Sequence, residues 1–423
     1  MFKQWLKQLI PGRYRPWLLG ILSFFNGLMN LPAALRFGLL DRETLFALNV
    51  SRHERRIVFV SERPSWREAK LAYGLKKIGW DVIQLHRFQP MFQDVSDFAE
   101  MQQFSSPWAA SELAFKTRTK AFHTFSPNCD DTAVQMVTQK PGRVLVDFYD
   151  DFFGLTDGLP DARDKFAVEI AKQEFCIEKA DALCCRDIQL QYRRKALGIG
   201  RHRPVICFPD YCWNRDSLRP AREDDAVHIV QTGWVGFESR GEEDIGCFLV
   251  ARKFVDAGCH FHFYLHPTFP ALGSALFKSV FEQYIDLGAK TGRVHFHATV
   301  PPHEIAGEMA KYDYGFGMMN AANFPDIPWK HSNPKRLPYC GSSRVFDYLD
   351  AGLGILLDGN LRYMRHVFEP YGVLFNGTAI LKGGNIYEAL RQKPSRPALV
   401  GAREALSLER HVPRLAKFYE SLG

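Results

Sequence analysis

The chain has 423 residues, of which 46% are hydrophobic and 24% charged, a balance that argues against a disordered, collagenous or coiled-coil chain. This length favours two domains. Nine cysteines without a Cys-x-x-Cys pair argue against a disulfide scaffold and indicate a cytosolic chain with reduced thiols. Residues 1–56 hold nine Lys and Arg against three Asp and Glu, and so carry +6 of the net charge of +7. The remainder is nearly neutral, which argues against a nucleic-acid-binding protein.

The N-terminal segment, residues 1–50, differs from the rest. Apolar side chains recur there at helical spacing between Lys and Gln residues, at Phe2, Trp5, Leu6 and Leu9. The apolar run that follows, residues 17–31, is shorter than the roughly 20 residues that a spanning helix needs. We therefore expect residues 1–40 to lie on an anionic membrane surface. Packing on the protein's own surface, a single membrane span and a signal peptide remain as alternatives.

From residue 55 onward, short apolar runs alternate with helix-like segments. Residues 57–60 form a fully apolar run, as expected of a strand buried on both faces. A helix is predicted over residues 66–78 and a second strand over residues 81–85. This βαβ unit is the usual start of a Rossmann-like sheet.

The same alternation continues in two blocks. In the first block we expect a long helix at residues 164–179 and strands at residues 121–125, 144–148, 182–185 and 204–209. In the second we expect strands at residues 227–230, 260–265, 294–297, 314–317 and 355–357, and helices at residues 244–257, 302–311, 343–351 and 405–422. The chain thus divides into an N-terminal domain (55–215), a linker (216–225), a C-terminal domain (226–395) and a C-terminal helix (396–423) that packs back on the N-terminal domain.

The segment of residues 342–353 reads Ser-Ser-Arg-Val-Phe-Asp-Tyr-Leu-Asp-Ala-Gly-Leu. It resembles the donor-binding segment of GT-B glycosyltransferases of the family-4-like group, in which a basic residue, a Phe and an acid precede a helix that closes on Ala-x-Gly. Weaker resemblances at residues 57–85, 178–182 and 294–317 fall in the order that such enzymes show. The resemblance covers about residues 55–423 and implies an α/β GT-B fold. Two Rossmann-like domains, the N-terminal one on the acceptor side and the C-terminal one on the donor side, would then face each other across a cleft, with an apolar basic N-terminal extension.

Two features depart from the family pattern. Tyr339 stands where the family has the earlier of two acids spaced eight residues apart, which concerns the acid that contacts the donor sugar. The loop at residues 61–66 lacks the paired glycines that many members place near the donor phosphates.

The residues of the distinctive segment suit a nucleotide-sugar donor. Ser342 and Ser343 stand where a helix should begin, so their hydroxyls can cap it while free amide groups and the positive helix end face a phosphate. Arg344 can hold phosphate oxygens bidentately. The resemblance implies that Asp347 contacts the donor ribose. The alternative is an ordinary capped helix with an exposed Arg–Asp pair.

Further donor contacts are expected from two loops. Residues 320–341 form a long segment that carries Lys330, Lys335 and Arg336, which could act as a cationic flap over the diphosphate or belong to a solvated insertion. In similar enzymes a basic residue at the place of Arg240 binds the diphosphate, and glycines such as Gly233 allow close backbone approach. Neighbouring acids could instead pair with Arg240.

The catalytic candidates lie in the first block. His123 ends a predicted strand, and related enzymes often have a His there, near the reacting groups; a structural hydrogen bond is the alternative. Asp150 and Asp151 follow the strand at residues 144–148, at the edge of the sheet where ligands bind. Either could orient the acceptor hydroxyl or act as a base. They could also cap the next helix.

No metal site or cofactor is expected. His260 and His262 share one strand face, as do His295 and His297, but the sequence places no third ligand beside either pair. Phenylalanines alternate with these histidines, which favours ordinary strand alternation. A helix terminus and arginines can supply the positive charge that a departing diphosphate requires.

The sequence therefore predicts a glycosyltransferase of the hexosyltransferase type, which the resemblance implies to be retaining. It would move a sugar from a nucleotide-sugar donor to an acceptor hydroxyl on a glycan or lipid-linked acceptor in cell-surface polysaccharide biosynthesis. We expect it to be cytoplasmic and peripheral on the inner face of the plasma membrane, with no nucleic acid as partner. A catalytically inactive GT-B-like scaffold that binds nucleotide-sugars, favoured by Tyr339, and a GT-B sugar-nucleotide epimerase are the alternatives.

Overall fold

The computed structural model describes residues 55–117, 119–126, 131–156, 160–214, 225–233, 235, 247–266, 268–318 and 334–422. The predicted membrane-surface element at residues 1–40, Arg240 and Lys330 lie outside these residues. The chain forms two compact units. The first runs to Phe208 and takes up the chain again from Val412, and the second runs from Pro209 to His411.

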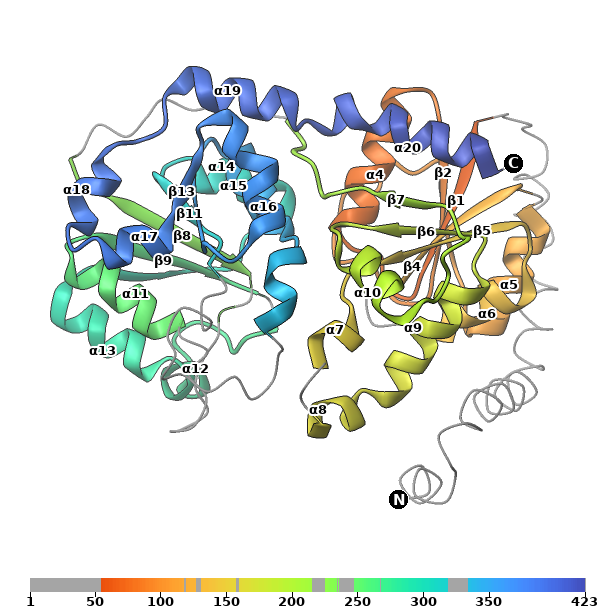
Figure 1. The fold of residues 1–423 in the computed structure, drawn as a ribbon, viewed down its shortest axis with the longest axis horizontal. Helices are drawn as coiled ribbons and strands as arrows, with labels where there is room; N and C mark the ends of the chain where they lie inside the picture. The colour runs from red at the N-terminus through yellow and green to blue at the C-terminus, as the bar shows by residue number, and fades with distance from the viewer. Residues whose placement is uncertain are drawn as a thin grey trace. The chain divides into compact units, whose positions relative to one another are not determined.

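In its described part, the first unit is a seven-stranded parallel sheet with helices on both faces (Figure 1). Its strand order, β3-β2-β1-β4-β5-β6-β7, is that of a Rossmann fold. The strands are β1 (Arg56–Ser61), β2 (Asp81–His86), β3 (Glu100–Gln103), β4 (Ala121–Ser126), β5 (Arg143–Phe148), β6 (Ala182–Cys185) and β7 (Val205–Cys207). The helices are α4 (Trp66–Lys77), α5 (Pro107–Thr117), α6 (Asp131–Gln139), α7 (Phe152–Thr156), α8 (Pro160–Lys165), α9 (Ala167–Lys179) and α10 (Gln189–Leu197), joined by the last residues of α20 (Leu408–Leu422).

The second unit repeats this plan with six described strands in the order β10-β9-β8-β11-β12-β13. The strands are β8 (His228–Gly233), β9 (His260–Leu265), β10 (Val294–His297), β11 (Tyr314–Phe316), β12 (Gly354–Leu357) and β13 (Leu374–Asn376). The helices are α11 (Cys247–Asp256), α12 (Ala275–Val280), α13 (Glu282–Thr291), α14 (Pro302–Met309), α15 (Ser343–Asp350), α16 (Arg362–Phe368), α17 (Gly377–Lys382), α18 (Ile386–Arg391) and α19 (Arg396–Ala405), with the 3-10 helices η3 (Pro334–Tyr339) and η4 (Glu369–Tyr371).

The strand cores explain why these sequences form covered parallel sheets. The four residues of β1 from Ile57 to Val60 are all completely buried, as expected where helices cover both faces. In the second unit, Phe261, Phe263 and Phe296 pack on one face of the sheet with Phe254 of α11 and Tyr284 of α13. Burying each such side chain contributes about 1.5–3 kcal/mol.

Two predicted helices differ from the structure. The helix predicted at residues 164–179 is divided into α8 and α9 at Phe166, whose ring packs 5.3 Å from that of Phe152. The helix predicted at residues 405–422 is α20 and begins three residues later than predicted, at Leu408, because α19 ends at Ala405 and the Ser407 side chain accepts a hydrogen bond from the backbone amide of Arg410.

The unit boundaries also differ from the predicted ones. Residues 209–214 belong to the second unit, where the backbone amide of Trp213 donates to Asp350 at 3.0 Å. Helix α19 belongs there too, because Arg403 forms a buried ion pair with Asp350 at 3.4 Å. The prediction that all of residues 396–423 pack on the N-terminal domain is therefore wrong for residues before Val412.

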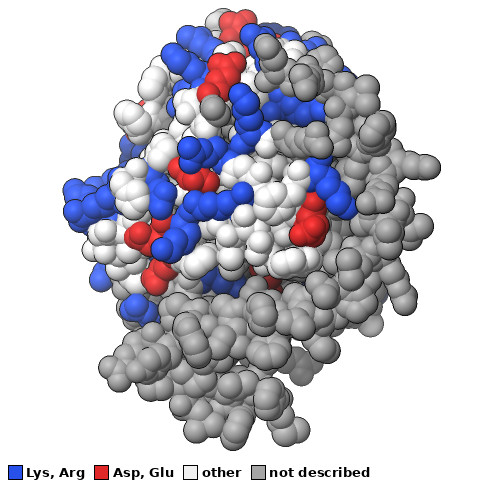
Figure 2. All heavy atoms as spheres, turned by 90° about the vertical axis from the view of Figure 1, so that its right-hand side faces the viewer, with Lys and Arg blue, Asp and Glu red and all other residues white. Residues whose placement is uncertain are grey.

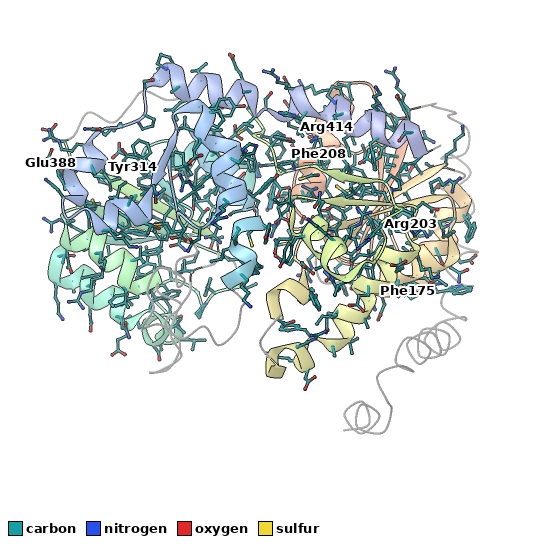
Figure 3. The ribbon with its side chains drawn as sticks, in the orientation of Figure 1. Phe175, Arg203, Phe208, Tyr314, Glu388 and Arg414 are labelled. Atoms are coloured by element: carbon teal, nitrogen blue, oxygen red, sulfur yellow. The ribbon has the colours of Figure 1, made fainter. Side chains whose placement is uncertain are left out.

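The last residues of α20 are anchored in the first unit. Arg414 donates to the carbonyl of Cys207 at 2.8 Å and lies over the ring of Phe208 at 5.5 Å (Figure 3). Among the described helices, none is long and apolar enough to cross a membrane.

Candidate functional site

The carboxyl edge of the second sheet contains a point where the strand order reverses, between β8 and β11. Open α/β sheets bind ligands at such switch points. Strand β8 ends there at Gly233. Its φ of +79° lies in the left-handed region, which residues other than glycine rarely adopt. The backbone therefore turns sharply at the place where a ligand would approach it.

Helix α15 brings its first turn to this switch point. The guanidinium Nη2 of Arg344 lies 4.0 Å from the position that a Cβ atom would take on Gly233. Two residues predicted to bind the donor, 111 positions apart in the sequence, thus lie together in the structure. Asp347 follows on the next turn of the helix and is half-buried.

The start of α15 departs from the prediction in one respect. Ser342 is the N-cap residue with an extended backbone (φ −138°, ψ 122°), but its side chain makes no capping hydrogen bond. The predicted cap by the Ser342 hydroxyl is therefore wrong, and the amide groups of the first turn are not served by it. Ser342 and Ser343 are both half-buried at this helix start.

Tyr348 fixes the position of α15, and sequence reasoning missed it. Its hydroxyl donates to the carbonyl of Phe316 at 3.1 Å and accepts from the backbone amide of Thr232 at 3.1 Å, so it joins the ends of β11 and β8. Burial raises the pKa of Tyr348, and the hydroxyl therefore stays protonated as a donor. The ring packs directly on Gly315, where an added Cβ would lie only 2.0 Å from the Tyr348 Cγ.

The described part of the predicted flap is packed structure. Lys335 is exposed and Arg336 half-buried, both on η3, the 3-10 helix that leads into α15. Leu337 and Cys340 beside them are almost fully buried, and the Cys340 thiol donates to the carbonyl of Arg336 at 3.3 Å. Residues 334–341 of this segment are therefore held in place by buried apolar side chains.

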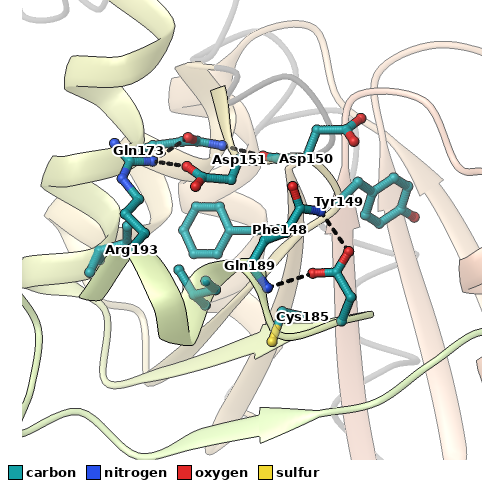
Figure 4. A pocket seen from close by; sticks show the side chains of 11 residues that line it. Phe148, Tyr149, Asp150, Asp151, Gln173, Cys185, Gln189 and Arg193 are labelled. Atoms are coloured by element: carbon teal, nitrogen blue, oxygen red, sulfur yellow. Dashed lines mark hydrogen bonds and ion pairs between the residues drawn. The ribbon is translucent and has the colours of Figure 1, made fainter. Parts of the chain in front are cut away.

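In the first unit, Asp150 and Asp151 line a pocket at the carboxyl ends of β5 and β6 (Figure 4). Asp151 is almost fully buried and pairs with the equally buried Arg193 at 2.7 Å. Burial raises the pKa of Asp151 more than Arg193 lowers it. Gln173 also lines the pocket. Its side chain accepts a hydrogen bond from Arg193 at 2.5 Å and donates one to the carbonyl of Asp150 at 2.5 Å.

The two aspartates therefore differ in what they can do. The side chain of Asp150 is 45% exposed and lies 3.1 Å from the Arg186 guanidinium, so it can reach an incoming ligand. Asp151 is held in its buried ion pair with Arg193 and forms part of the pocket lining.

His123 lies within β4 and not at its end, because the strand continues to Ser126. It is completely buried, and its two ring nitrogens lie 2.6 Å from the Tyr419 hydroxyl and 3.1 Å from the Asp147 carboxylate. Burial lowers the pKa of His123, although Asp147 opposes this shift. His123 thus ties the last turns of α20 to the sheet, which is a structural role.

Asp147 is the centre of this buried network. Its Oδ2 atom accepts from Arg67 at 2.7 Å as well as lying near His123. Burial alone would raise the pKa of Asp147, but the Arg67 guanidinium and His123 hold it below its ordinary value. Arg67 also donates to the carbonyl of Phe208 at 2.8 Å, so the charge pair is embedded in further hydrogen bonds.

The same cluster does not suit a metal ion. In the described part of the chain, His123, Asp147 and Cys184 form one group of possible ligands, whose donor atoms all lie within 4.8 Å of one another. Arg67 already supplies the positive charge there, with Nη2 3.5 Å from the Cys184 sulfur. Burial raises the pKa of Cys184 well above its usual value, so the thiol stays protonated and is a poor ligand.

A second residue that sequence reasoning missed is Glu68, at the start of α4 behind β1. Its carboxylate accepts from the backbone amide of Ser65 at 3.1 Å and from the Tyr149 hydroxyl at 3.0 Å. Burial raises the pKa of Glu68 to about 7. The Ser-x-x-Glu spacing of residues 65–68 is a capping-box signature and could have identified this pair.

Comparisons with solved structures show which fold the chain resembles. The structure resembles a sucrose-phosphate synthase from Thermosynechococcus elongatus (TM-score 0.57, 11% identity, 87% of this chain and 99% of that one). It also resembles a glycosyltransferase involved in avilamycin A biosynthesis (TM-score 0.53, 13% identity, 87% and 98%). A third similar structure is an alpha-glucosyltransferase in complex with UDP-glucose and DNA containing an abasic site (TM-score 0.52, 10% identity, 85% and 94%). No protein-family model and no curated protein matches the sequence. The predicted GT-B fold of two Rossmann-like domains is confirmed.

Proposed function

We propose that the protein is a glycosyltransferase that moves a sugar from a nucleotide-sugar donor to an acceptor hydroxyl. One observation carries the proposal. At the switch point of the second sheet, the left-handed turn at Gly233 and the Arg344 guanidinium meet at the start of α15. The solved structures of similar fold include glycosyltransferases, one of them with UDP-glucose.

The chemistry of this site suits a departing nucleoside diphosphate. The turn at Gly233 has no side chain to block the backbone, and Arg344 offers a planar fork to two phosphate oxygens. The N-terminal end of α15 adds amide groups and a positive partial charge. In the proposal Asp347 accepts from the ribose hydroxyls, and no metal or cofactor is required for leaving-group stabilisation.

On the acceptor side, the proposal assigns Asp150 to orient or deprotonate the acceptor hydroxyl, because its carboxylate is partly exposed at a ligand-binding edge. Retention of the anomeric configuration, the hexosyltransferase type and an acceptor in cell-surface polysaccharide or glycolipid synthesis belong to the proposal through the family resemblance. NMR of the anomeric proton in the first-formed product tests retention.

Replacing Arg344 by alanine should weaken binding of a nucleoside diphosphate by about 2–5 kcal/mol, or roughly 30-fold or more. The reason is that the half-buried guanidinium, which pairs with the phosphate oxygens in the proposal, is lost. Isothermal titration of UDP, GDP and ADP into the full-length protein measures this. Arg252→Ala is the matched control, since Arg252 lies on α11 of the same unit, has a side chain 57% exposed and pairs with Asp256 at 3.4 Å. Equal affinity of the Arg344 variant and the wild type would refute the assigned role.

A panel of activated sugars separates this function from its alternatives. Acceptor-dependent release of nucleotide supports transfer. Rearrangement of the donor sugar without an acceptor supports an epimerase, and binding without any change in the donor supports a scaffold, the reading that Tyr339 favours.

The proposal also places the protein at the cytoplasmic face of the plasma membrane through residues 1–40, with no nucleic acid as partner. On the face shown in Figure 2, outside the grey atoms, Lys and Arg are interspersed with Asp, Glu and neutral residues and form no continuous basic field.

Deleting residues 1–40 should release the protein from anionic vesicles in a sedimentation assay, because the deleted segment carries the basic and apolar side chains. Unchanged pelleting of the shortened protein would contradict this attachment.

A further inference from the structure

Five histidines lie on one face of the second sheet, on three adjacent strands. We name them the histidine ladder: His228 of β8, His260 and His262 of β9, and His295 and His297 of β10. Their rings stack across the strands, with centroids 4.5 Å apart for His262 and His295 and 5.3 Å apart for His262 and His297. The sequence shows two His-x-His pairs, and the parallel register brings them together with His228.

The ladder is joined by three contacts between ring nitrogens. His228 Nδ1 lies 2.9 Å from His262 Nε2, and His262 Nδ1 lies 3.0 Å from His297 Nε2. A separate contact of 3.0 Å joins His260 Nδ1 to His295 Nε2. Each contact runs diagonally between neighbouring strands, because the register pairs His228 with His260 and His262 with His295.

We propose that the histidine ladder binds a divalent first-row transition-metal ion at its two edge-strand pairs, His260 with His295 and His262 with His297. Imidazole nitrogen is a preferred ligand of Ni²⁺, Cu²⁺ and Zn²⁺. Strand β10 is the edge of the described sheet, and His260, His295 and His297 are only partly buried, which gives an ion access.

Each pair is close enough to chelate one ion after a small shift of its rings. Two ligands about 2.05 Å from a metal lie about 2.9 Å apart when they meet it at a right angle, and about 3.3 Å apart in a tetrahedral site. The paired nitrogens lie 3.0 Å apart, which is the length of the hydrogen bond that joins them. A site of imidazole nitrogens and water without a thiolate suits Ni²⁺ and Cu²⁺ better than Zn²⁺.

The contacts within each pair show which nitrogens would face an ion. These are His260 Nδ1 with His295 Nε2, and His262 Nδ1 with His297 Nε2. Each ring can then carry its single proton on its other nitrogen. Binding replaces the hydrogen bond of a pair by two metal–nitrogen bonds.

The surroundings complete the site in part. The Tyr312 hydroxyl lies 3.2 Å from His297 Nε2 and offers an oxygen beside the second pair. The nearby charges of Lys311 and Glu308 pair with each other at 2.8 Å, so they add little net field. Because the ladder supplies nitrogens in pairs, water completes the coordination. His260 and His262 lie in the first half of β9, away from the edge where Gly233 ends β8, so this site is separate from the proposed donor site.

Titration of NiCl₂ and ZnCl₂ into chelator-treated full-length protein tests the proposal by calorimetry. We expect saturable Ni²⁺ binding that is tighter than Zn²⁺ binding. The double variant His295→Gln/His297→Gln, which removes one ligand from each pair at partly exposed positions, should weaken Ni²⁺ binding about tenfold or more. The matched control is His202→Gln/His366→Gln, which replaces two exposed histidines outside the ladder.

The absence of saturable Ni²⁺ binding would overturn the proposal, as would equal Ni²⁺ affinity of the double variant and the wild type. In that case the ladder is a chain of hydrogen bonds that holds β10 on the sheet. If the double variant does not fold, the Cu²⁺ electron paramagnetic resonance spectrum of the wild type decides. Hyperfine coupling to imidazole nitrogens supports the site, and a spectrum of sulfur or oxygen ligands alone refutes it.

Discussion

Replacing Asp147 by alanine should destabilise the first unit by about 3–5 kcal/mol, the largest effect that we expect from a single substitution. The change leaves the Arg67 guanidinium buried without the carboxylate that lies 2.7 Å from it. It also removes the partner of His123 Nε2 at 3.1 Å. Urea-induced unfolding, followed by circular dichroism and analysed for the first-unit transition, measures the loss of unfolding free energy.

Two further variants make this prediction sharp. Asp256→Ala removes one partner of a 3.4 Å ion pair whose side chains are more than half exposed, and should change stability by less than about 0.5 kcal/mol. The paired change Arg67→Met/Asp147→Leu should cost less than Asp147→Ala, because no uncompensated charge stays buried. A loss for Asp147→Ala no larger than that of the exposed control would show that the network does not stabilise the fold.

The buried network also makes a pH-dependent contribution to stability. The pKa values of His123 and Asp147 are both below their ordinary values of 6.5 and 3.8. At these two groups the unfolded chain binds more protons than the folded one, so their contribution to stability falls as the pH decreases, whereas Glu68, with its pKa raised to about 7, acts in the opposite direction between about pH 7 and 4.5. The part due to His123 is present above pH 6.5 and is lost as the pH falls below that value, and the part due to Asp147 is lost below pH 3.8.

Replacing Gly315 by alanine should cost about 3 kcal/mol, at the upper end of the range for an overpacked core. The new Cβ would lie 2.0 Å from Cγ and 2.5 Å from Cβ of Tyr348, which are the rigid part of that side chain. Relief of this clash requires a shift of α15, which carries Arg344 and Asp347. We therefore expect both a lower thermal unfolding midpoint and weaker binding of a nucleoside diphosphate.

Gly401→Ala is the matched control for this prediction. Gly401 lies in α19 and a Cβ there would meet no atom within 4 Å, so the alanine should stabilise the helix by up to about 1 kcal/mol. A Gly315→Ala protein with the unfolding midpoint and the diphosphate affinity of the wild type would show that α15 is not held as the structure indicates.

The regular elements could be predicted because their apolar patterns are local. The predicted strands at residues 182–185, 260–265 and 294–297 have the bounds of β6, β9 and β10. The short elements could not be predicted in this way. Strand β3 carries Glu100, Met101, Gln102 and Gln103, and it is a strand because it pairs with β2 and not because of its own pattern.

The sequence motif predicted residues of the candidate donor site, but not the residue that holds them in place. Arg344 and Asp347 follow from the motif, whereas Tyr348 acts through hydrogen bonds to the ends of two strands distant in the sequence. For His123, the sequence identified the residue but could not show what surrounds its ring. A histidine in a strand looks the same in sequence whether its ring faces a ligand or a partner such as Tyr419, which lies 296 residues further along the chain.

The return of α20 to the first unit has a practical consequence for dissecting the molecule. A fragment that ends at Phe208 would lack Tyr419 and Arg414, and with them the hydroxyl beside His123 and the guanidinium over Phe208. Neither half of this protein can be isolated by a single cleavage, because two separate stretches of chain build the first unit. A soluble amino-terminal half would have to be co-produced with a peptide of residues 412–422, or have that peptide fused to it by a flexible tether.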